Sequence, residues 1–269
     1  MLWGPGALGP RMNTLWTRRD VLLGLGVTLA TACGSRVKSS PATARPVGLR
    51  TLPEIEAAVG GRVGVFALDT GSGRTLAHRQ DERFAMCSTF KWTLVAAILV
   101  RVDRGECSLD ERVRYGRGDL LEHAPVTTAH LAHGGMTVEA LALAAITVSD
   151  NTATNLLLGK VGGPAGLTGM FRQLGDPVTR LDRNEPTLNE HAPGDPRDTT
   201  SPRAMVGLMR QVLCGDVLSR TARERLLGWL RACETGTNRL RAGLPRGWTV
   251  GDKTGTGRRS AVNDVAIAF

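Results

Sequence analysis

A serine and a lysine three positions apart could form the chemical centre of this protein. Ser88 and Lys91 are the first and last residues of the tetrad Ser88-Thr89-Phe90-Lys91. In a helix, a spacing of three places both side chains on one face. A serine hydroxyl becomes nucleophilic when a neighbour takes its proton, which a desolvated lysine with a lowered pKa can do. About one Ser-x-x-Lys is expected by chance in a chain this long. An N-cap serine beside a surface lysine is therefore the alternative.

Two tripeptides further along the chain strengthen the catalytic interpretation. Ser149-Asp150-Asn151 interrupts a helical segment, and Lys253-Thr254-Gly255 lies in a late strand-like segment. Each tripeptide is expected by chance in roughly 5% of chains of this length, so both together are rare. Taken singly, a polar turn and a strand end explain them. Their joint presence in this order favours a site for nucleophilic catalysis.

A helical middle segment is expected to position the Ser88 tetrad and the Ser149 tripeptide. Apolar periodicity predicts a helix at 52–59 and a helical block at 89–102, 137–148 and 153–161. Ser201 as N-cap and Pro202 in the first turn predict a helix to residue 213. Another helix is predicted at 220–233, ending near Gly236.

Strands are predicted at both ends of this helical block. Segments 62–69 and 74–79 form a hairpin around Thr70-Gly71-Ser72-Gly73, and strands return at 248–255 and 261–269. Two strands, a helical block and two more strands predict an α+β fold. Its antiparallel sheet is completed from both chain ends, with an all-α lobe inserted between them.

The three motifs, in this order, are similar to those of the class A serine β-lactamases over about residues 51–269. The family's Glu-x-x-Leu-Asn loop is matched by Glu185-Pro186-Thr187-Leu188-Asn189. Arg183 would pair with Asp198 to hold that loop; a solvated acidic loop is the alternative. The resemblance implies a sheet flanked by terminal helices. Its α/β part would comprise 51–84 and 246–269, and its helical part 85–245.

The resemblance also implies a role for each matching residue. Ser88 would attack the lactam carbonyl of penicillins and cephalosporins and form an acyl-enzyme, with Lys91 and Glu185 sharing the base work. Ser149 would pass a proton to the lactam nitrogen. Backbone N–H groups of Ser88 and Thr256 would form the oxyanion hole, and Glu185 with Asn189 would position the deacylating water. The residues expected to bind substrate are Asn151, Asn189, Lys253, Thr254, Gly255 and Thr256. No metal or other cofactor is implied, and the protein is expected to act as a monomer.

Some positions depart from the family pattern. Val262 stands where many members carry an arginine for the substrate carboxylate, and Arg239 matches the arginine that other members use instead; a solvated charge is the alternative. His123 stands where the family usually has an aromatic residue beside the site entrance, with an ordinary loop histidine as the alternative. Members with a disulfide at Cys87 pair it with the position of Gly257, so no such bridge is predicted.

The family pattern continues beyond the position of Phe269 with one more strand and a long helix. The resemblance therefore implies that these two elements are missing from this chain. The strand would lie between the first hairpin and segment 261–269, so its loss would leave two sheet edges unpaired. An inactive truncated fragment is one interpretation of the sequence.

Residues 1–32 have the composition of an export signal. A basic start precedes an apolar run from Val21 to Ala30, which is too short to span a bilayer, and small residues lead to Cys33. Thr17-Arg18-Arg19-Asp20-Val21-Leu22 resembles a twin-arginine signal, and an ordinary secretory leader is the alternative. The sequence predicts a linker at 33–50 and a periplasmic or secreted protein, or a lipoprotein anchored at Cys33.

The charge distribution argues against a nucleic-acid partner. Of the net charge of +9, residues 1–50 carry +6 and the remainder +3. A nearly balanced body with one Tyr and five Phe offers neither a phosphate-binding surface nor many rings on which bases could stack. We therefore expect no nucleic-acid binding, and contact with a membrane only through the leader or a lipid at Cys33.

Neither the cysteines nor the histidines suggest a metal site. Cys87, Cys107, Cys214 and Cys233 lack paired metal-type spacing. His130 and His133 are interpreted as solvated loop residues.

Other functions fit part of the pattern. A DD-peptidase or penicillin-binding protein shares the three motifs, but the loop from Glu185 to Asn189 argues against it. A non-catalytic β-lactam binder remains an alternative from a different class.

Overall fold

The structure is a computed structural model that describes residues 50–258 and 261–269. The predicted signal at 1–32 and nearly all of the predicted linker, Cys33 included, lie outside the described residues. The helices are α1 (Leu52–Val59), α2 (Lys91–Asp103), α3 (Pro125–Ala129), α4 (Val138–Thr147), α5 (Asn151–Lys160), α6 (Gly163–Gln173), α7 (Pro202–Cys214), α8 (Arg220–Arg231) and α9 (Leu240–Gly243). Short 3₁₀ turns are η1 (Cys87–Phe90), η2 (Arg117–Asp119), η3 (Leu131–His133) and η4 (Thr187–Asn189). The strands are β1 (Val65–Leu68), β2 (Thr75–His78), β3 (Phe84–Ala85), β4 (Arg112–Arg114), β5 (Gly135–Thr137), β6 (Thr199–Thr200), β7 (Val250–Thr256) and β8 (Val262–Ala268).

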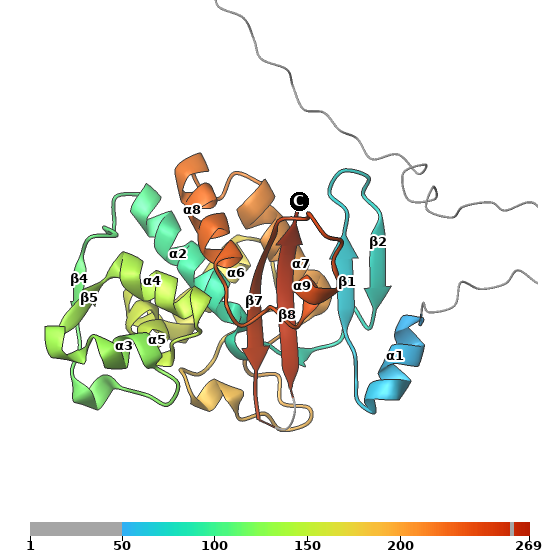
Figure 1. Cartoon of the computed structure of the whole chain (residues 1–269), viewed down its shortest axis with the longest axis horizontal. Helices are drawn as coiled ribbons and strands as arrows, with labels where there is room; N and C mark the ends of the chain where they lie inside the picture. The colour runs from blue at the N-terminus through green and yellow to red at the C-terminus, as the bar shows by residue number, and fades with distance from the viewer. Residues whose placement is uncertain (1–49, 259–260) are drawn as a thin grey trace, which may run out of the picture. The chain divides into compact units, whose positions relative to one another are not determined.

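Strands from the two ends of the described chain form two antiparallel hairpins. In the first, Val65 lies opposite His78 on β1 and β2. In the second, β7 and β8 pair from Val250 opposite Ala268 to Thr256 opposite Val262. Figure 1 places β7 and β8 between the helical lobe and the β1–β2 hairpin. In the part of the chain that the structure describes, no ladder joins the two hairpins, and the strand expected between them stays a prediction.

Helix α1 shows how local sequence fixes an element. Thr51 Oγ1 accepts the Glu54 N–H at 3.4 Å, and the Glu54 carboxylate accepts the Thr51 N–H at 2.6 Å, which makes a capping box. Pro53 occupies the first turn, where its missing N–H costs nothing. Gly60 ends the helix with a φ of 71°, a conformation that glycine adopts without strain.

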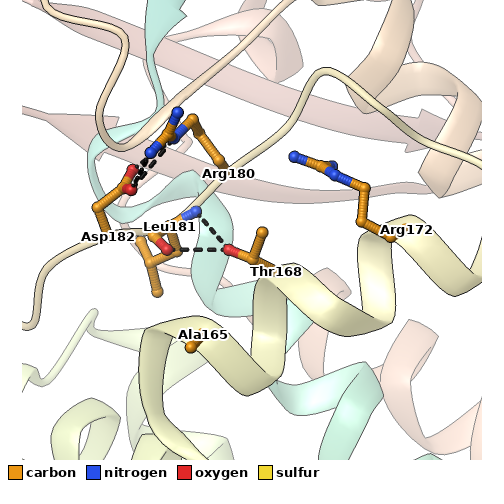
Figure 2. Close-up of a pocket in the computed structure, with 6 residues that line it drawn as sticks. All are labelled: Ala165, Thr168, Arg172, Arg180, Leu181 and Asp182. Carbon is orange, nitrogen blue, oxygen red and sulfur yellow. Dashed lines mark hydrogen bonds and ion pairs between the residues drawn. The ribbon is translucent and has the colours of Figure 1, made fainter.

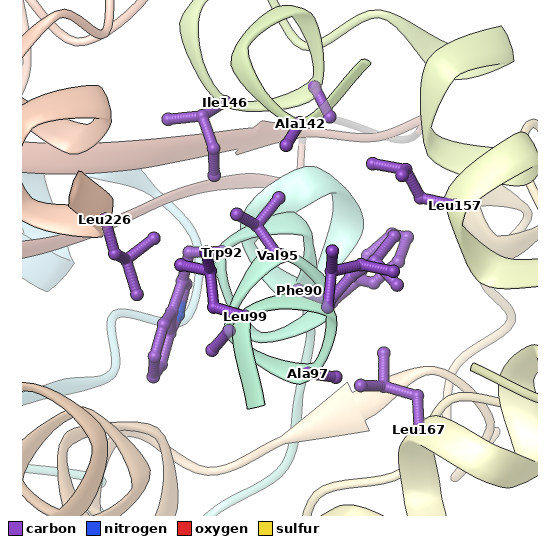
Figure 3. Close-up of a cluster of buried hydrophobic side chains, with 14 of the residues drawn as sticks. Phe90, Trp92, Val95, Ala97, Leu99, Ala142, Ile146, Leu157, Leu167 and Leu226 are labelled. Carbon is purple, nitrogen blue, oxygen red and sulfur yellow. The ribbon is translucent and has the colours of Figure 1, made fainter. Parts of the chain in front are cut away.

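The hydrophobic core is built around α2. Its first nine residues are all buried, and Figure 3 shows this helix surrounded by side chains of α4, α5, α6 and α8. Ile146, Leu157 and Leu226 each have an exposed fraction of 0% in this cluster. Because α2 begins at Lys91, directly after the η1 turn that contains Ser88, the core holds both residues in a fixed place.

Most predicted elements match the observed ones to within three residues, but α6 was missed by the sequence analysis. Its segment contains Gly163, Gly166 and Gly169, which lower helix propensity. Leu167 and Phe171, one turn apart, are fully buried and offset that cost. A Cβ on Gly166 would lie 1.9 Å from the Val161 carbonyl oxygen, so glycine permits a close backbone approach there.

Among the described residues, no helix is both long and apolar enough to cross a membrane.

Candidate active site

Ser88 lies on a buried turn against which β7 packs closely. The turn η1 leads directly into α2, so Ser88 is part of a 3₁₀ segment rather than the first turn of the predicted α-helix, and Met86 has no capping side chain. A Cβ on Gly255 would lie 2.6 Å from the Met86 carbonyl oxygen and 3.0 Å from the Thr89 nitrogen. Only glycine lets β7 approach the turn this closely, and this approach brings Lys253 toward Ser88.

Three of the predicted catalytic side chains meet at one carboxylate oxygen. Ser88 Oγ donates to Glu185 Oε1 at 3.1 Å, and Lys91 Nζ lies 3.1 Å from the same oxygen. The side chains of Lys91 and Glu185 are both completely buried. Burial lowers the pKa of Lys91 from its usual value, and the charge of Glu185 opposes this shift. The Ser88 hydroxyl and the Lys91 amine thus both contact one buried carboxylate that can accept a proton.

The Ser149-Asp150-Asn151 turn supplies the other partners of Lys91. Nζ donates to the Ser149 carbonyl at 2.8 Å and to Asn151 Oδ1 at 2.6 Å, and it lies 3.2 Å from Ser149 Oγ. Ser149 adopts a φ of 62°, which turns the chain so that its hydroxyl and its carbonyl both face Lys91. The Asn151 amide donates to the Glu122 carbonyl at 2.9 Å and fixes the turn to the neighbouring loop.

Asp150 anchors this turn. The sequence motif contained Asp150 but gave it no role of its own. Its buried carboxylate caps α5 by accepting the Ala153 N–H at 2.9 Å. The same carboxylate accepts the backbone N–H groups of Val126 at 3.0 Å and Thr127 at 2.9 Å. Asp150 therefore joins α3 to α5. An aspartate directly before a helical segment is a typical N-cap signal, and it could have identified this role.

Lys253 faces the same turn from β7. Its Nζ donates to Ser149 Oγ at 3.2 Å and to the Thr254 carbonyl at 2.8 Å. Burial and then the charge of Lys91 lower the pKa of Lys253 to about 7. Ser149 Oγ thus lies between two lysines, where it can pass a proton between them and a bound molecule.

The loop that carries Glu185 is fixed by an ion pair. Arg183 Nε lies 2.6 Å from Asp198 Oδ2, and Asp198 Oδ1 accepts the backbone N–H groups of Asp182 at 2.7 Å and Arg183 at 3.0 Å. Glu185 precedes a cis peptide bond to Pro186. Asn189 donates to Glu185 Oε2 at 2.7 Å, so the second carboxylate oxygen is oriented as well.

Asn155 on α5 also orients Glu185, and the sequence analysis did not single it out. Its Oδ1 accepts the Glu185 N–H at 3.0 Å, and its amide donates to the Glu185 carbonyl at 2.8 Å.

The start of the loop, its root at Leu181, rests on α6. Thr168 Oγ1 bonds both the N–H and the carbonyl of Leu181 at 2.9 Å (Figure 2). Arg172 and Arg180 border a hollow of about 420 Å³ at this root.

The remaining substrate-binding candidates lie at the end of β7. Thr254 Oγ1 bonds Thr235 Oγ1 at 2.5 Å. Arg239 donates to the Gly255 carbonyl at 3.0 Å and to Thr256 Oγ1 at 2.7 Å. Arg239 is therefore attached to the strand rather than free in solvent. Val262 lies opposite Thr256 and is 64% exposed.

His123 lies at the edge of the site and forms part of its framework. Its carbonyl accepts the Asn151 N–H at 3.0 Å, and its Nε2 is 2.8 Å from the Val148 carbonyl oxygen. The residue has a φ of 55° and is exposed. Its imidazole therefore bridges two loops next to the Ser149 turn.

The four cysteines of the described chain are unpaired. Burial raises the pKa of Cys87 to about 12, which keeps its thiol protonated. A Cβ on Gly257 would lie 2.6 Å from Cys87 Sγ, so the two positions do face each other. His130 and His133 are exposed, and their ring centroids are 5.6 Å apart. Within residues 50–258 and 261–269, no three His, Cys, Asp or Glu side chains are grouped as metal ligands.

The "Beta-lactamase enzyme family" model matches residues 50–269. The chain belongs to this family. The chain is also similar to the solved structure of an ancestral class A β-lactamase. The TM-score is 0.80 and the sequence identity 58%, over 81% of this chain and 84% of the ancestral protein. The β-lactamase L2 of Stenotrophomonas maltophilia is 50% identical over 241 residues, which are 90% of this chain and 79% of the relative. The β-lactamase AST-1 of Nocardia asteroides is 47% identical over 252 residues, which are 92% and 81%. These matches confirm the predicted family, its α+β fold and its β-lactam hydrolase activity.

Proposed function

We propose that this β-lactamase hydrolyses penicillins and cephalosporins through an acyl-enzyme on Ser88, which water activated by Glu185 then releases. The observation that carries the proposal is the contact of Ser88 Oγ and Lys91 Nζ with one oxygen of Glu185, both at 3.1 Å. A nucleophile, a proton acceptor and a cation in direct contact are what serine acyl transfer requires.

In acylation, the Ser88 hydroxyl attacks the lactam carbonyl while Glu185 and Lys91 share the removal of its proton. The hydroxyl donates to Glu185 in the free enzyme, which makes this carboxylate the first acceptor. Four oxygens lie within 3.2 Å of Lys91 Nζ. Burial lowers the pKa of Lys91, which favours the neutral amine that can accept a proton. Lys91 and Lys253 both contact Ser149 Oγ, so Ser149 can carry a proton to the lactam nitrogen as the ring opens.

The negative oxygen that forms on the carbonyl is assigned to the backbone N–H groups of Ser88 and Thr256. The close packing of β7 on η1 at Gly255 brings these two segments together. Removing one such donor typically costs about 3–4 kcal/mol of transition-state stabilisation. Because both are backbone groups, the packing of the strand, rather than a side chain, determines their position.

Lys253, Thr254, Thr256 and Arg239 are assigned to the carboxylate that penicillins and cephalosporins carry. Lys253 provides a cation in a buried environment, and Arg239 provides a second one bonded to Thr256. Charge-assisted hydrogen bonds to a carboxylate are stronger than neutral ones. Asn151 is assigned to the remainder of the substrate.

Deacylation requires a water held by Glu185 and Asn189. Asn189 donates to Glu185 Oε2 and fixes the carboxylate, and Asn155 fixes its backbone on both sides. A carboxylate in contact with Ser88 supports hydrolysis of the acyl-enzyme. It disfavours the alternative of a DD-peptidase, which would stay acylated by a β-lactam.

We also propose that residues 1–32 direct export by a twin-arginine route and that residues 33–50 link them to the catalytic domain at 51–269. The expected location is the periplasm or the exterior, or a membrane surface through a lipid on Cys33. The enzyme is expected to act as a monomer.

Turnover of nitrocefin, a chromogenic cephalosporin, tests the proposed function. The purified chain should open the lactam ring catalytically, and Ser88→Ala should abolish this activity because no acyl-enzyme can form. Ring opening that continues in Ser88→Ala would contradict the assignment of the nucleophile.

A further inference from the structure

Two carboxylates lie on the face of β7 and β8 that is turned away from Lys253. Side chains alternate along a strand, so Asp252 points away from the Lys253 face, and Asp264, opposite Thr254, shares the face of Asp252. The two positions are diagonal neighbours, which lie within reach of each other across an antiparallel pair. Among the described residues, neither Asp252 Oδ2 nor Asp264 Oδ1 has a hydrogen-bond partner, although both atoms are buried.

The segment that carries Arg239 rests directly on these carboxylates. A Cβ on Gly236 would lie 1.7 Å from Asp252 Oδ2, so only glycine fits over this oxygen. Arg241 forms an ion pair with Asp252 Oδ1, and the Leu240 N–H donates to Asp264 Oδ2 at 3.1 Å. The two aspartates thus hold the first two residues of α9, immediately after Arg239.

Asp264 is also close to the positive charges of the site. Arg239 donates to the carbonyl of the preceding residue, Asn263, at 2.5 Å. The charged groups that act on Asp264 are Asp252 and Lys253 from β7 and Arg239 from the overlying segment, while the charge of Asp252 is balanced by Arg241. Burial, followed by the charge of Asp252, raises the pKa of Asp264 to about 6.

We propose that Asp264 is a positioning residue for the carboxylate-binding end of the site, because its own carboxyl proton can bond to the neighbouring Asp252 carboxylate, and the loss of this proton changes how strongly Arg239 and Lys253 attract a substrate carboxylate. With the proton on Asp264, this carboxyl group donates to Asp252, and both unpartnered oxygens are satisfied. When the proton leaves, a second negative charge is added beside Arg239 and Lys253, and a substrate carboxylate is bound less tightly. This inference rests on the proposed function.

The Asp264 proton can be observed without any turnover. In the whole ¹⁵N-labelled chain, the amide shift of Leu240 should titrate with a midpoint of about 6, because its N–H donates to Asp264. In Asp264→Asn this titration should disappear. A Leu240 shift that stays constant between pH 5 and 7 would overturn the proposal.

The effect on substrate binding is measured as the KM of the unmodified enzyme divided by the KM of Asp264→Asn. The ratio should be near one at pH 5, where Asp264 is protonated, and about three- to tenfold at pH 7, where the unmodified enzyme carries one more negative charge near the two cations. The kcat ratio should not change between these two pH values. Asp110→Asn, an equal charge change at an exposed position, should follow the unmodified enzyme.

A KM ratio that is the same at both pH values would overturn the positioning role even if Leu240 titrates. The absence of turnover at every pH would overturn the proposed function and with it the positioning role. The Leu240 measurement distinguishes these cases because it reports on the carboxyl pair alone.

Discussion

Glu185 is the residue on which both halves of the proposed reaction depend. Its Oε1 contacts the nucleophile and Lys91, and its Oε2 is held by Asn189. One carboxylate can therefore accept the proton of Ser88 in acylation and the proton of water in deacylation. Lys91 contacts Oε1, the same oxygen as Ser88, whereas Asn189 contacts Oε2.

We expect Glu185→Ala to accumulate the acyl-enzyme. Loss of a general base typically slows the step that it serves about 10²–10⁴-fold, and in the proposed mechanism Glu185 is the base of deacylation. Intact mass spectrometry after addition of a penicillin should show a stable adduct on Ser88. Glu190→Ala removes an exposed carboxylate from the same loop and should turn over normally. A Glu185→Ala enzyme without an adduct and with normal turnover would show that the deacylation assignment is wrong.

Lys253 should make substrate binding weaker above neutral pH. Its pKa is lowered to about 7 by burial and by Lys91, so the ammonium is present below this pH and is lost as the pH rises through it. Because the ammonium attracts the substrate carboxylate, KM should rise between pH 7 and 9. Steady-state kinetics of Lys253→Arg provide the control, since a guanidinium stays charged throughout this range. An equally steep rise of KM in Lys253→Arg would contradict the assignment.

At the scale of elements, the contact between β7 and η1 determines the geometry of the site. A methyl group at Gly255 would lie 2.6 Å from the Met86 carbonyl oxygen, and neither backbone segment can move without displacing Ser88 or Lys253. The strand and the turn therefore pack without room for a side chain at Gly255.

Gly255→Ala should therefore reduce activity more than stability. Inserting a methyl group into a packed contact costs about 1–3 kcal/mol of the free energy of unfolding, and the displacement should lower kcat/KM at least about 10²-fold. Gly228→Ala on α8 is the matched control, because nothing lies within 4 Å of the added methyl and alanine favours a helix. Nitrocefin kinetics together with thermal unfolding of both variants would test this. Normal activity of Gly255→Ala would exclude a tight contact.

At the scale of the whole described domain, α2 is the central helix of the core, and it begins with Lys91 directly after the η1 turn that carries Ser88. Lys91 through Leu99 are buried without interruption, and four other helices surround them (Figure 3). Two buried lysines and a buried glutamate are costly to desolvate. The apolar packing around α2 must offset this cost for the site to exist.

Leu157→Ala should test how much this packing contributes. Leu157 is completely buried, and such a truncation costs about 2–5 kcal/mol of the free energy of unfolding. The melting temperature measured by circular dichroism should fall by roughly 5–15 °C. Leu143→Ala makes the same change at a position that is 39% exposed and should have a small effect. Equal losses in the two variants would contradict the central role of the α2 cluster.

The sequence by itself determined which chemical groups are present and in what order along the chain. The Ser88 tetrad, the two tripeptides and the Glu185 loop identified the family, because such combinations do not arise by chance. Helix boundaries such as those of α1 and α7 also followed from local signals, since Thr51, Ser201 and the adjacent prolines act over a single turn.

Only the tertiary structure decided how these groups interact. The meeting of Ser88 and Lys91 at one oxygen of Glu185, the framing of Glu185 by Asn155 and the diagonal pairing of Asp252 with Asp264 depend on contacts between distant segments. The glycine-rich helix α6 forms because Leu167 and Phe171 are buried against elements remote in sequence. The pKa shifts of Lys91, Lys253 and Asp264 arise from burial, which no local pattern specifies, because it is determined by the surrounding elements once they are packed.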